Sequence, residues 1–90
     1  MLTHRQRRAI LVRRLTLVHE YNVLHIERLD LHAQLATLRT TWMTDPLSSA
    51  ERRTLVAELK ALSDRLRAIS PRSQSILLEQ YTLVHELAGA

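Results

Sequence analysis

Apolar side chains recur along the first half of the chain at alternating intervals of three and four residues. The seam they form consists of Ile10, Leu17, Tyr21, Leu24, Leu31, Leu35, Leu38 and Trp42. Two arginines, Arg14 and Arg28, interrupt it. This spacing is typical of a helix that packs against another helix as in a coiled coil. Because Thr3 can cap the start and no Gly or Pro precedes Pro46, the pattern predicts one long helix over about 4–42.

The chain breaks after this helix and continues with two further helical patterns. Pro46 disfavours helical backbone at Asp45, and Ser48 to Glu51 matches a capping box. A narrow apolar stripe follows, made of Leu55, Leu59, Leu62, Leu66 and Ile69. It predicts a second helix over 49–69. Ser70–Pro71 is a favourable helix start and predicts a third helix over 71–88.

These elements predict an all-α fold in a single domain of residues 1–90. The second helix is expected to pack antiparallel on the second half of the first. If the last two helices run collinear, the chain is a long antiparallel helical hairpin. If the chain reverses at Ser70–Pro71, it is a three-helix assembly. The sequence leaves both open, although antiparallel helices are normally joined by two to five residues, more than this junction provides.

Both ends of the chain carry apolar side chains over a wider arc than one neighbouring helix can cover. The additional apolar positions are Leu11, Leu15, Val18, Leu29, Leu77, Tyr81 and Val84. A hairpin of one chain would leave them in water, and large exposed apolar patches usually mark an interface. We therefore expect these residues to mediate self-association, in a homodimer with a four-helix core.

Two segments of the chain are similar to each other. Residues 10–20 and 76–86 have identical residues at seven of eleven aligned positions, Ile-Leu at the start and Thr-Leu-Val-His-Glu at the end. A hairpin turning near Asp45 would place the segments opposite each other, so that both present the same face to a partner. Coincidence in a Leu-rich helical chain is the alternative explanation.

Charge distinguishes the N-terminal segment, residues 4–14, from the rest of the chain. It contains Arg5, Arg7, Arg8, Arg13 and Arg14, all before the first acidic residue, and the formal net charge of the chain is +4. Guanidinium groups bind carboxylates and phosphates through paired donors. We expect these arginines to dock on a protein partner with an acidic surface, with nucleic acid as the alternative and a solvated helix surface as the simplest interpretation.

Motifs for catalysis, cofactors and metals are not recognisable. The chain has no cysteine, no glycine-rich phosphate loop and no nucleophile elbow. His25 and His32 are seven residues apart, about 10 Å along a helix axis, which is too far to share one ion. We therefore expect no enzyme activity, no cofactor and no metal.

The apolar runs of the chain are all short. None approaches the roughly 18 residues of a membrane helix, and the run Ala9–Val12 is too short for a signal peptide, so we expect a cytoplasmic protein without a membrane span. The sequence thus predicts a small non-catalytic protein–protein interaction module, such as an adaptor, assembly factor or inhibitor-like regulator. The alternative is a small nucleic-acid-binding protein that uses the Arg5–Arg14 region.

Overall fold

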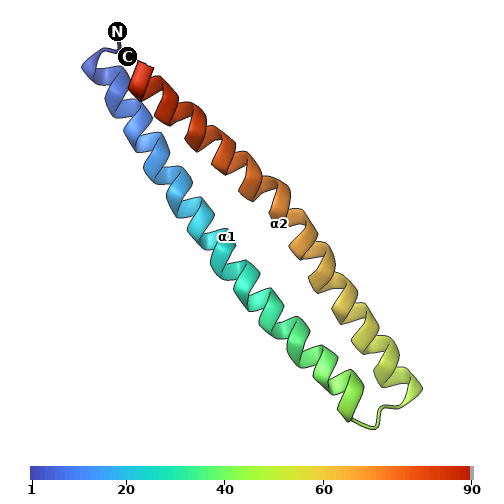
Figure 1. Cartoon of the computed structure of the whole chain (residues 1–90). Coiled ribbons are helices and arrows are strands. Elements are labelled where there is room, and N and C mark those ends of the chain that lie inside the picture. Colours follow the sequence, from blue (N-terminus) through green and yellow to red (C-terminus); the bar gives the residue numbers. More distant parts are fainter. Residues whose placement is uncertain (90) are drawn as a thin grey trace.

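Two long antiparallel helices form the computed structural model, which describes residues 1–89 (Figure 1). Helix α1 spans His4–Thr44 and helix α2 spans Ser49–Gly89. The molecule measures 67 × 15 × 15 Å, and its radius of gyration is 20.2 Å, against about 12 Å for a compact chain of this length. The all-α hairpin is therefore confirmed, and it is a rod in which each helix packs along the other.

Reciprocal side-chain caps fix the starts of both helices. The Thr3 hydroxyl accepts from the Gln6 N–H at 3.1 Å, and the Gln6 side chain accepts from the Thr3 N–H at 2.8 Å. Ser48 and Glu51 form the same arrangement at the start of α2, with both distances 3.2 Å. The hydrogen bonds from Ser48 lower the pKa of the Glu51 carboxyl. Capping boxes of this kind satisfy backbone donors that have no partner within the helix.

The predicted break at Ser70–Pro71 is wrong. Helix α2 continues through Pro71, so the expected helices 49–69 and 71–88 are one element. Proline inside a helix costs about 3 kcal/mol because it removes one backbone hydrogen bond. Pro71 lies on the exposed side of α2, whereas Ile69 and Ile76 on either side of it are buried against α1. Burial of each isoleucine contributes about 1.5–3 kcal/mol, so continuing the helix outweighs the cost of the proline.

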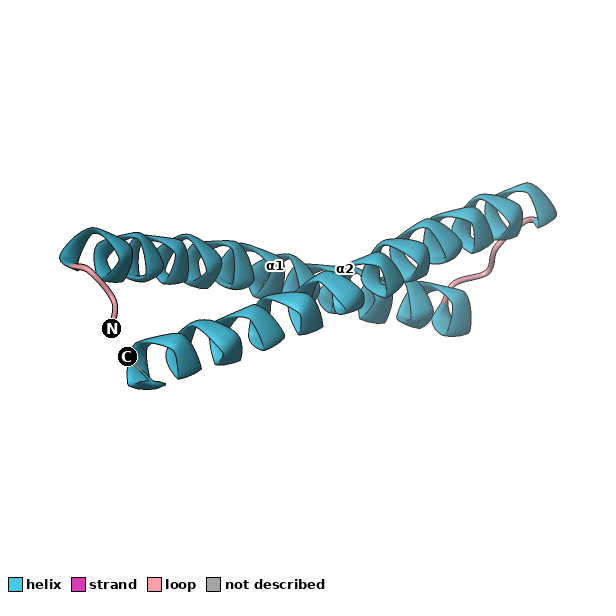
Figure 2. Ribbon diagram, turned by 90° about the horizontal axis from the view of Figure 1, so that it is seen from above, coloured by secondary structure: helices cyan, strands magenta, loops and turns pink. Residues whose placement is uncertain are grey.

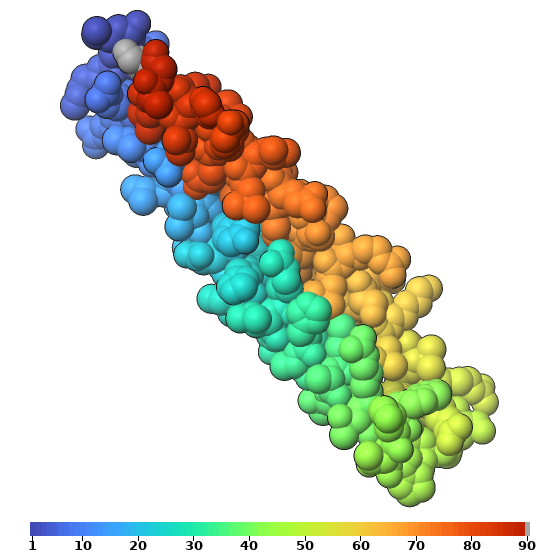
Figure 3. Space-filling view, viewed as in Figure 1, coloured from blue at the N-terminus to red at the C-terminus, as the bar shows by residue number. Residues whose placement is uncertain are grey.

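The predicted seam is the line along which the two helices pack. The most buried residues are Leu17, Leu31 and Leu35 of α1 and Leu55, Ile69, Ser73 and Ile76 of α2. The helices cross each other at a shallow angle when viewed from above (Figure 2). They remain side by side over the whole rod, and both terminal segments lie at the same end (Figure 3). One layer of side chains from each helix therefore provides the entire core.

Candidate interaction surfaces

Two polar layers interrupt the seam at the positions of Arg14 and Arg28. The Arg14 guanidinium donates to the Gln80 side-chain oxygen at 3.0 Å, and the Gln80 amide donates back to the Arg14 carbonyl at 2.9 Å. Arg28 donates to the hydroxyl of the buried Ser73 at 2.7 Å. Among residues 1–89 no buried side-chain nitrogen or oxygen lacks a partner. Polar side chains in a helical seam favour the one register that pairs them.

Three interhelical ion pairs follow one edge of the hairpin. They are Arg13–Glu79, Glu20–Arg72 and Glu27–Arg65, which we call the ion-pair ladder. Successive pairs are seven residues apart on both helices. Each arginine contacts its glutamate through two nitrogens, with distances of 2.5 and 3.0 Å in the first pair and 2.5 and 2.8 Å in the third. These hydrogen bonds lower the pKa of each carboxyl and raise the pKa of each guanidinium.

The opposite edge is apolar. The residues predicted for self-association remain largely exposed, with exposed fractions between 43 and 71%: Leu11, Leu15, Val18, Leu29, Leu77, Tyr81 and Val84, which we call the apolar edge. Val18 and Leu77 directly follow the seam residues Leu17 and Ile76, whereas every ladder residue directly precedes a seam position. Positions directly before and directly after a seam residue flank the seam on opposite sides. Six of these residues lie in the terminal half of the rod, whereas Leu29 lies past the midpoint of α1, beyond the exposed Asn22 and His25.

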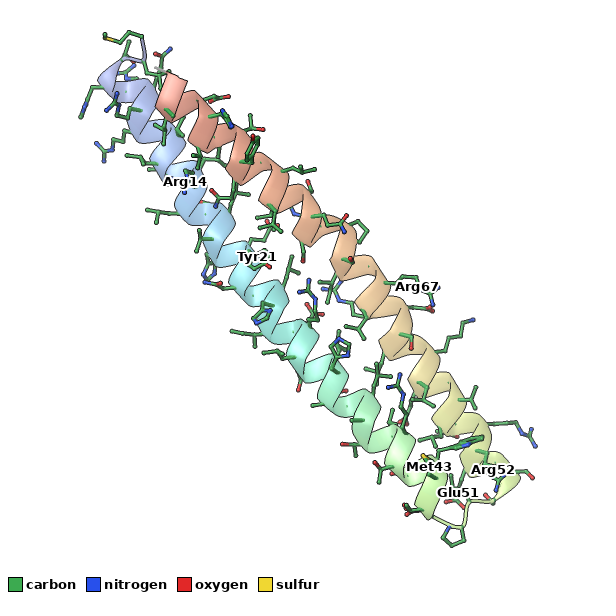
Figure 4. All side chains as sticks on the ribbon, in the orientation of Figure 1. Arg14, Tyr21, Met43, Glu51, Arg52 and Arg67 are labelled. Atoms are coloured by element: carbon green, nitrogen blue, oxygen red, sulfur yellow. The ribbon has the colours of Figure 1, made fainter. Side chains whose placement is uncertain are left out.

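A shallow groove lies within the apolar edge. Val18 and Leu77 line it together with Arg14, Tyr21, Ile76 and Gln80, and its volume is about 280 Å³. Arg14 and Tyr21 are labelled on the α1 side of the rod in Figure 4. Because Arg14 and Gln80 are among its lining residues, the lining of this groove is partly polar and partly apolar.

The two similar segments do lie opposite each other, as expected for a hairpin. Arg13 pairs with Glu79, and Arg14 pairs with Gln80, which are the positions that align with them in the two segments. A pseudo-two-fold axis perpendicular to the rod therefore passes between these two pairs. Rotation about this axis exchanges residues 10–20 with 76–86.

The five arginines of the basic segment separate into two groups. Arg13 and Arg14 contact α2, as described above. Arg5, Arg7 and Arg8 are exposed and form no ion pair with other residues in the 1–89 range. The structure therefore leaves three of the five predicted docking arginines available to a partner.

Sequence reasoning missed the α2 partners in these layers and pairs. Ser73 and Gln80 continue the three- and four-residue spacing from Ile69 through Ile76, which identifies them once α2 is treated as one helix. Arg65, Arg72 and Glu79 repeat at seven-residue intervals directly before seam positions. That repeat, opposite Glu27, Glu20 and Arg13, is the sequence pattern that predicts the ladder.

The part of the chain that the structure describes has neither a cluster of metal-ligand side chains nor a membrane-spanning helix. Over residues 1–89, no group of three or more His, Cys, Asp or Glu side chains is arranged to hold a metal ion. Neither of the helices in that range has a stretch apolar enough, over sufficient length, to cross a membrane.

Comparison with known proteins adds no relative. The chain matches no protein-family model, no curated protein and no solved structure.

Proposed function

We propose that this hairpin is a small non-catalytic interaction module, an adaptor, assembly factor or inhibitor-like regulator, and that its first partner is a second copy of itself. The observation that carries the proposal is the apolar edge. Its seven apolar side chains are exposed, six of them on the terminal half of the rod, while the ion-pair ladder occupies the other edge. An apolar strip of this extent is typical of an interface.

The energy available from the apolar edge is sufficient for a dimer. Full burial of a Val or Leu side chain contributes about 1.5–3 kcal/mol, so the remaining exposed half of each residue contributes about 1 kcal/mol. Seven such residues give roughly 7 kcal/mol per chain and twice that per dimer. Association costs about 4–15 kcal/mol. Subtracting this cost from about 14 kcal/mol leaves between roughly zero and 10 kcal/mol, and a dissociation constant of 1 μM needs about 8 kcal/mol of that range.

The pseudo-two-fold axis favours a second copy over an unrelated partner. A symmetric dimer joins the same surface of both chains, so the surface must complement itself. The similar segments 10–20 and 76–86 present nearly the same side chains in both directions along the rod. Two terminal halves that overlap through this surface produce a four-helix core, an arrangement that buries the wide apolar arc of both chains.

Sedimentation equilibrium at micromolar concentration tests the proposal. We expect a mass twice the chain mass of 10.4 kDa. The double variant Leu15→Glu with Val84→Glu places charges in the apolar edge and is expected to be a helical monomer. The matched control, Thr16→Glu with Thr82→Glu, changes two exposed residues that lie three positions after Arg13 and Glu79, on the ladder side, and is expected to stay dimeric. A wild-type mass of one chain would refute the dimer.

Nucleic acid is the second candidate partner, because Arg5, Arg7 and Arg8 are exposed and form no ion pair with any residue that the structure describes. An acidic protein surface would engage the same guanidinium groups. Fluorescence anisotropy with nonspecific DNA and RNA across a salt series separates the two. Binding that weakens steeply with salt supports nucleic acid. The absence of binding at low salt leaves the protein partner.

A further inference from the structure

A second hollow lies at the other end of the rod, beside the turn. Its volume is about 280 Å³, and we call it the turn-end groove; it is lined by Arg39, Trp42, Met43, Val56 and Leu59. Met43 is 82% exposed, and the Trp42 ring is also partly exposed. Figure 4 shows Met43 and Arg52 at this end of the hairpin. The groove is therefore an accessible apolar surface that is separate from the apolar edge.

Basic side chains surround the turn-end groove. Arg39 lines it, and the guanidinium carbon of Arg52 lies 5.5 Å from the centroid of the Trp42 ring. Residues three or four apart share one side of a helix. Arg53 precedes Val56 by three residues, and Lys60 follows Val56 by four. These two residues therefore extend the basic rim along α2.

The acidic residues near the turn lie on other surfaces. Glu51 and Glu58 line a hollow with Leu55, and Glu58 also lines one with Leu38. Asp45 lines a third hollow with threonines of α1 and accepts a hydrogen bond from the Thr44 hydroxyl at 3.0 Å. The groove thus combines an apolar floor with a rim of positive charge that acidic neighbours do not neutralise.

We propose that the turn-end groove binds an acidic amphipathic helix of a partner protein, which inserts one large apolar side chain between Trp42 and Val56. Its volume lies just below the roughly 300–1,000 Å³ of small-molecule pockets and suits one or two anchor side chains. Apolar anchors with a charged surround are the usual way in which a helix docks in a groove. Trp and Arg are the residue types that most often dominate interface energies. This site extends the proposed function to a second partner and does not depend on dimerisation.

Trp42 provides a direct readout because it is the only tryptophan in the chain. The probe is a synthetic peptide of about 18 residues, long enough to form a helix, with Leu at every third or fourth position and Glu elsewhere. The full-length protein is titrated with this peptide while Trp42 fluorescence is recorded. We expect a saturable blue shift that weakens at least fivefold at about 0.5 M salt, because charge attraction is screened there.

Variants locate the binding. Met43→Glu changes an exposed residue of the groove and is expected to weaken peptide binding at least tenfold without loss of helix. Thr54→Glu, which lies beside Glu51 on a different surface, is the matched control and is expected to remain within twofold of wild type. The monomeric double variant of the apolar edge is expected to bind the peptide normally, so failure of the dimer and failure of this site are distinguishable.

Three results would overturn the proposal. One is the absence of a Trp42 response to the acidic peptide at millimolar concentration. Another is equal binding of a peptide in which Lys replaces every Glu. The third is a Trp42 response to single-stranded DNA that exceeds the response to the peptide, which would assign the basic rim to nucleic acid instead.

Discussion

Replacement of Leu17 by alanine tests the seam where it is most tightly packed. Leu17, Ile69 and Ile76 are the large side chains of residues 1–89 that are less than 2% exposed. Alanine keeps the helix, because it has the highest helix propensity of all residues. The substitution therefore removes interhelical packing without changing backbone preference.

The expected loss follows from the atoms removed. Leu17→Ala deletes three carbons, and burial of each contributes about 0.8 kcal/mol, which gives about 2.4 kcal/mol before any cavity is counted. Measured Leu→Ala losses in cores range from about 2 to 5 kcal/mol. In a rod with a single layer of packing, the neighbouring side chains can move into the space that alanine leaves. We therefore expect a loss of about 2–3 kcal/mol in the free energy of unfolding. A domain of this length has roughly 5–13 kcal/mol of stability in total.

Urea unfolding followed by circular dichroism measures the effect, with all proteins at one concentration because the proposed dimerisation would add to apparent stability. The midpoint is expected to fall while the slope against urea stays the same. Leu78→Ala is the matched control, since it makes the same chemical change at a side chain that is 69% exposed. We expect its effect to stay within about 0.5 kcal/mol. Equal losses for the two variants would refute the assignment of Leu17 to the seam.

Two further predictions concern charge. The glutamates of the ion-pair ladder have lowered pKa values in the fold. The stability they contribute is therefore present above the unfolded Glu pKa of about 4.3 and is lost as pH falls through the folded pKa values. A melting temperature that does not fall between pH 6 and pH 3 would contradict this. Changing Arg5, Arg7 and Arg8 together to Gln is expected to alter the free energy of unfolding by less than about 0.5 kcal/mol, because exposed charges contribute little; a larger loss in urea unfolding would make these residues structural.

Much of the fold follows from residue spacing. The seam from Ile10 to Trp42 predicts α1 almost to its ends, because a three- and four-residue pattern without Gly or Pro has one regular solution. The capping residues Thr3 and Ser48 predict both helix starts. Such short-range rules succeed because the groups that satisfy them are only a few residues apart.

The features that the sequence predicted wrongly depend on contacts between residues far apart in the chain. Ser70–Pro71 has the local form of a helix start, and a local rule cannot weigh the burial of Ile69 and Ile76 against α1. Likewise, the sequence around Arg13 suggests an unpaired docking residue, whereas in the structure Arg13 pairs with Glu79, which lies 66 positions further along the chain. Among the five predicted docking arginines, Arg5, Arg7 and Arg8 form no ion pair within residues 1–89, and all three precede the first pair of the ladder.

The pseudo-two-fold axis explains where the two similar segments differ. Positions away from the axis contact a different position of the other segment, so identical residues such as Leu17 and Leu83 can occupy both. Positions at the axis face their own counterparts. Two arginines there would repel each other, whereas Arg13 opposite Glu79 and Arg14 opposite Gln80 form hydrogen bonds. The mismatches, confined to residues 12–15 and 78–81, include these two pairs. Complementary residues at the centre therefore join the two segments where identical arginines would repel, and the same asymmetry favours one register of the hairpin.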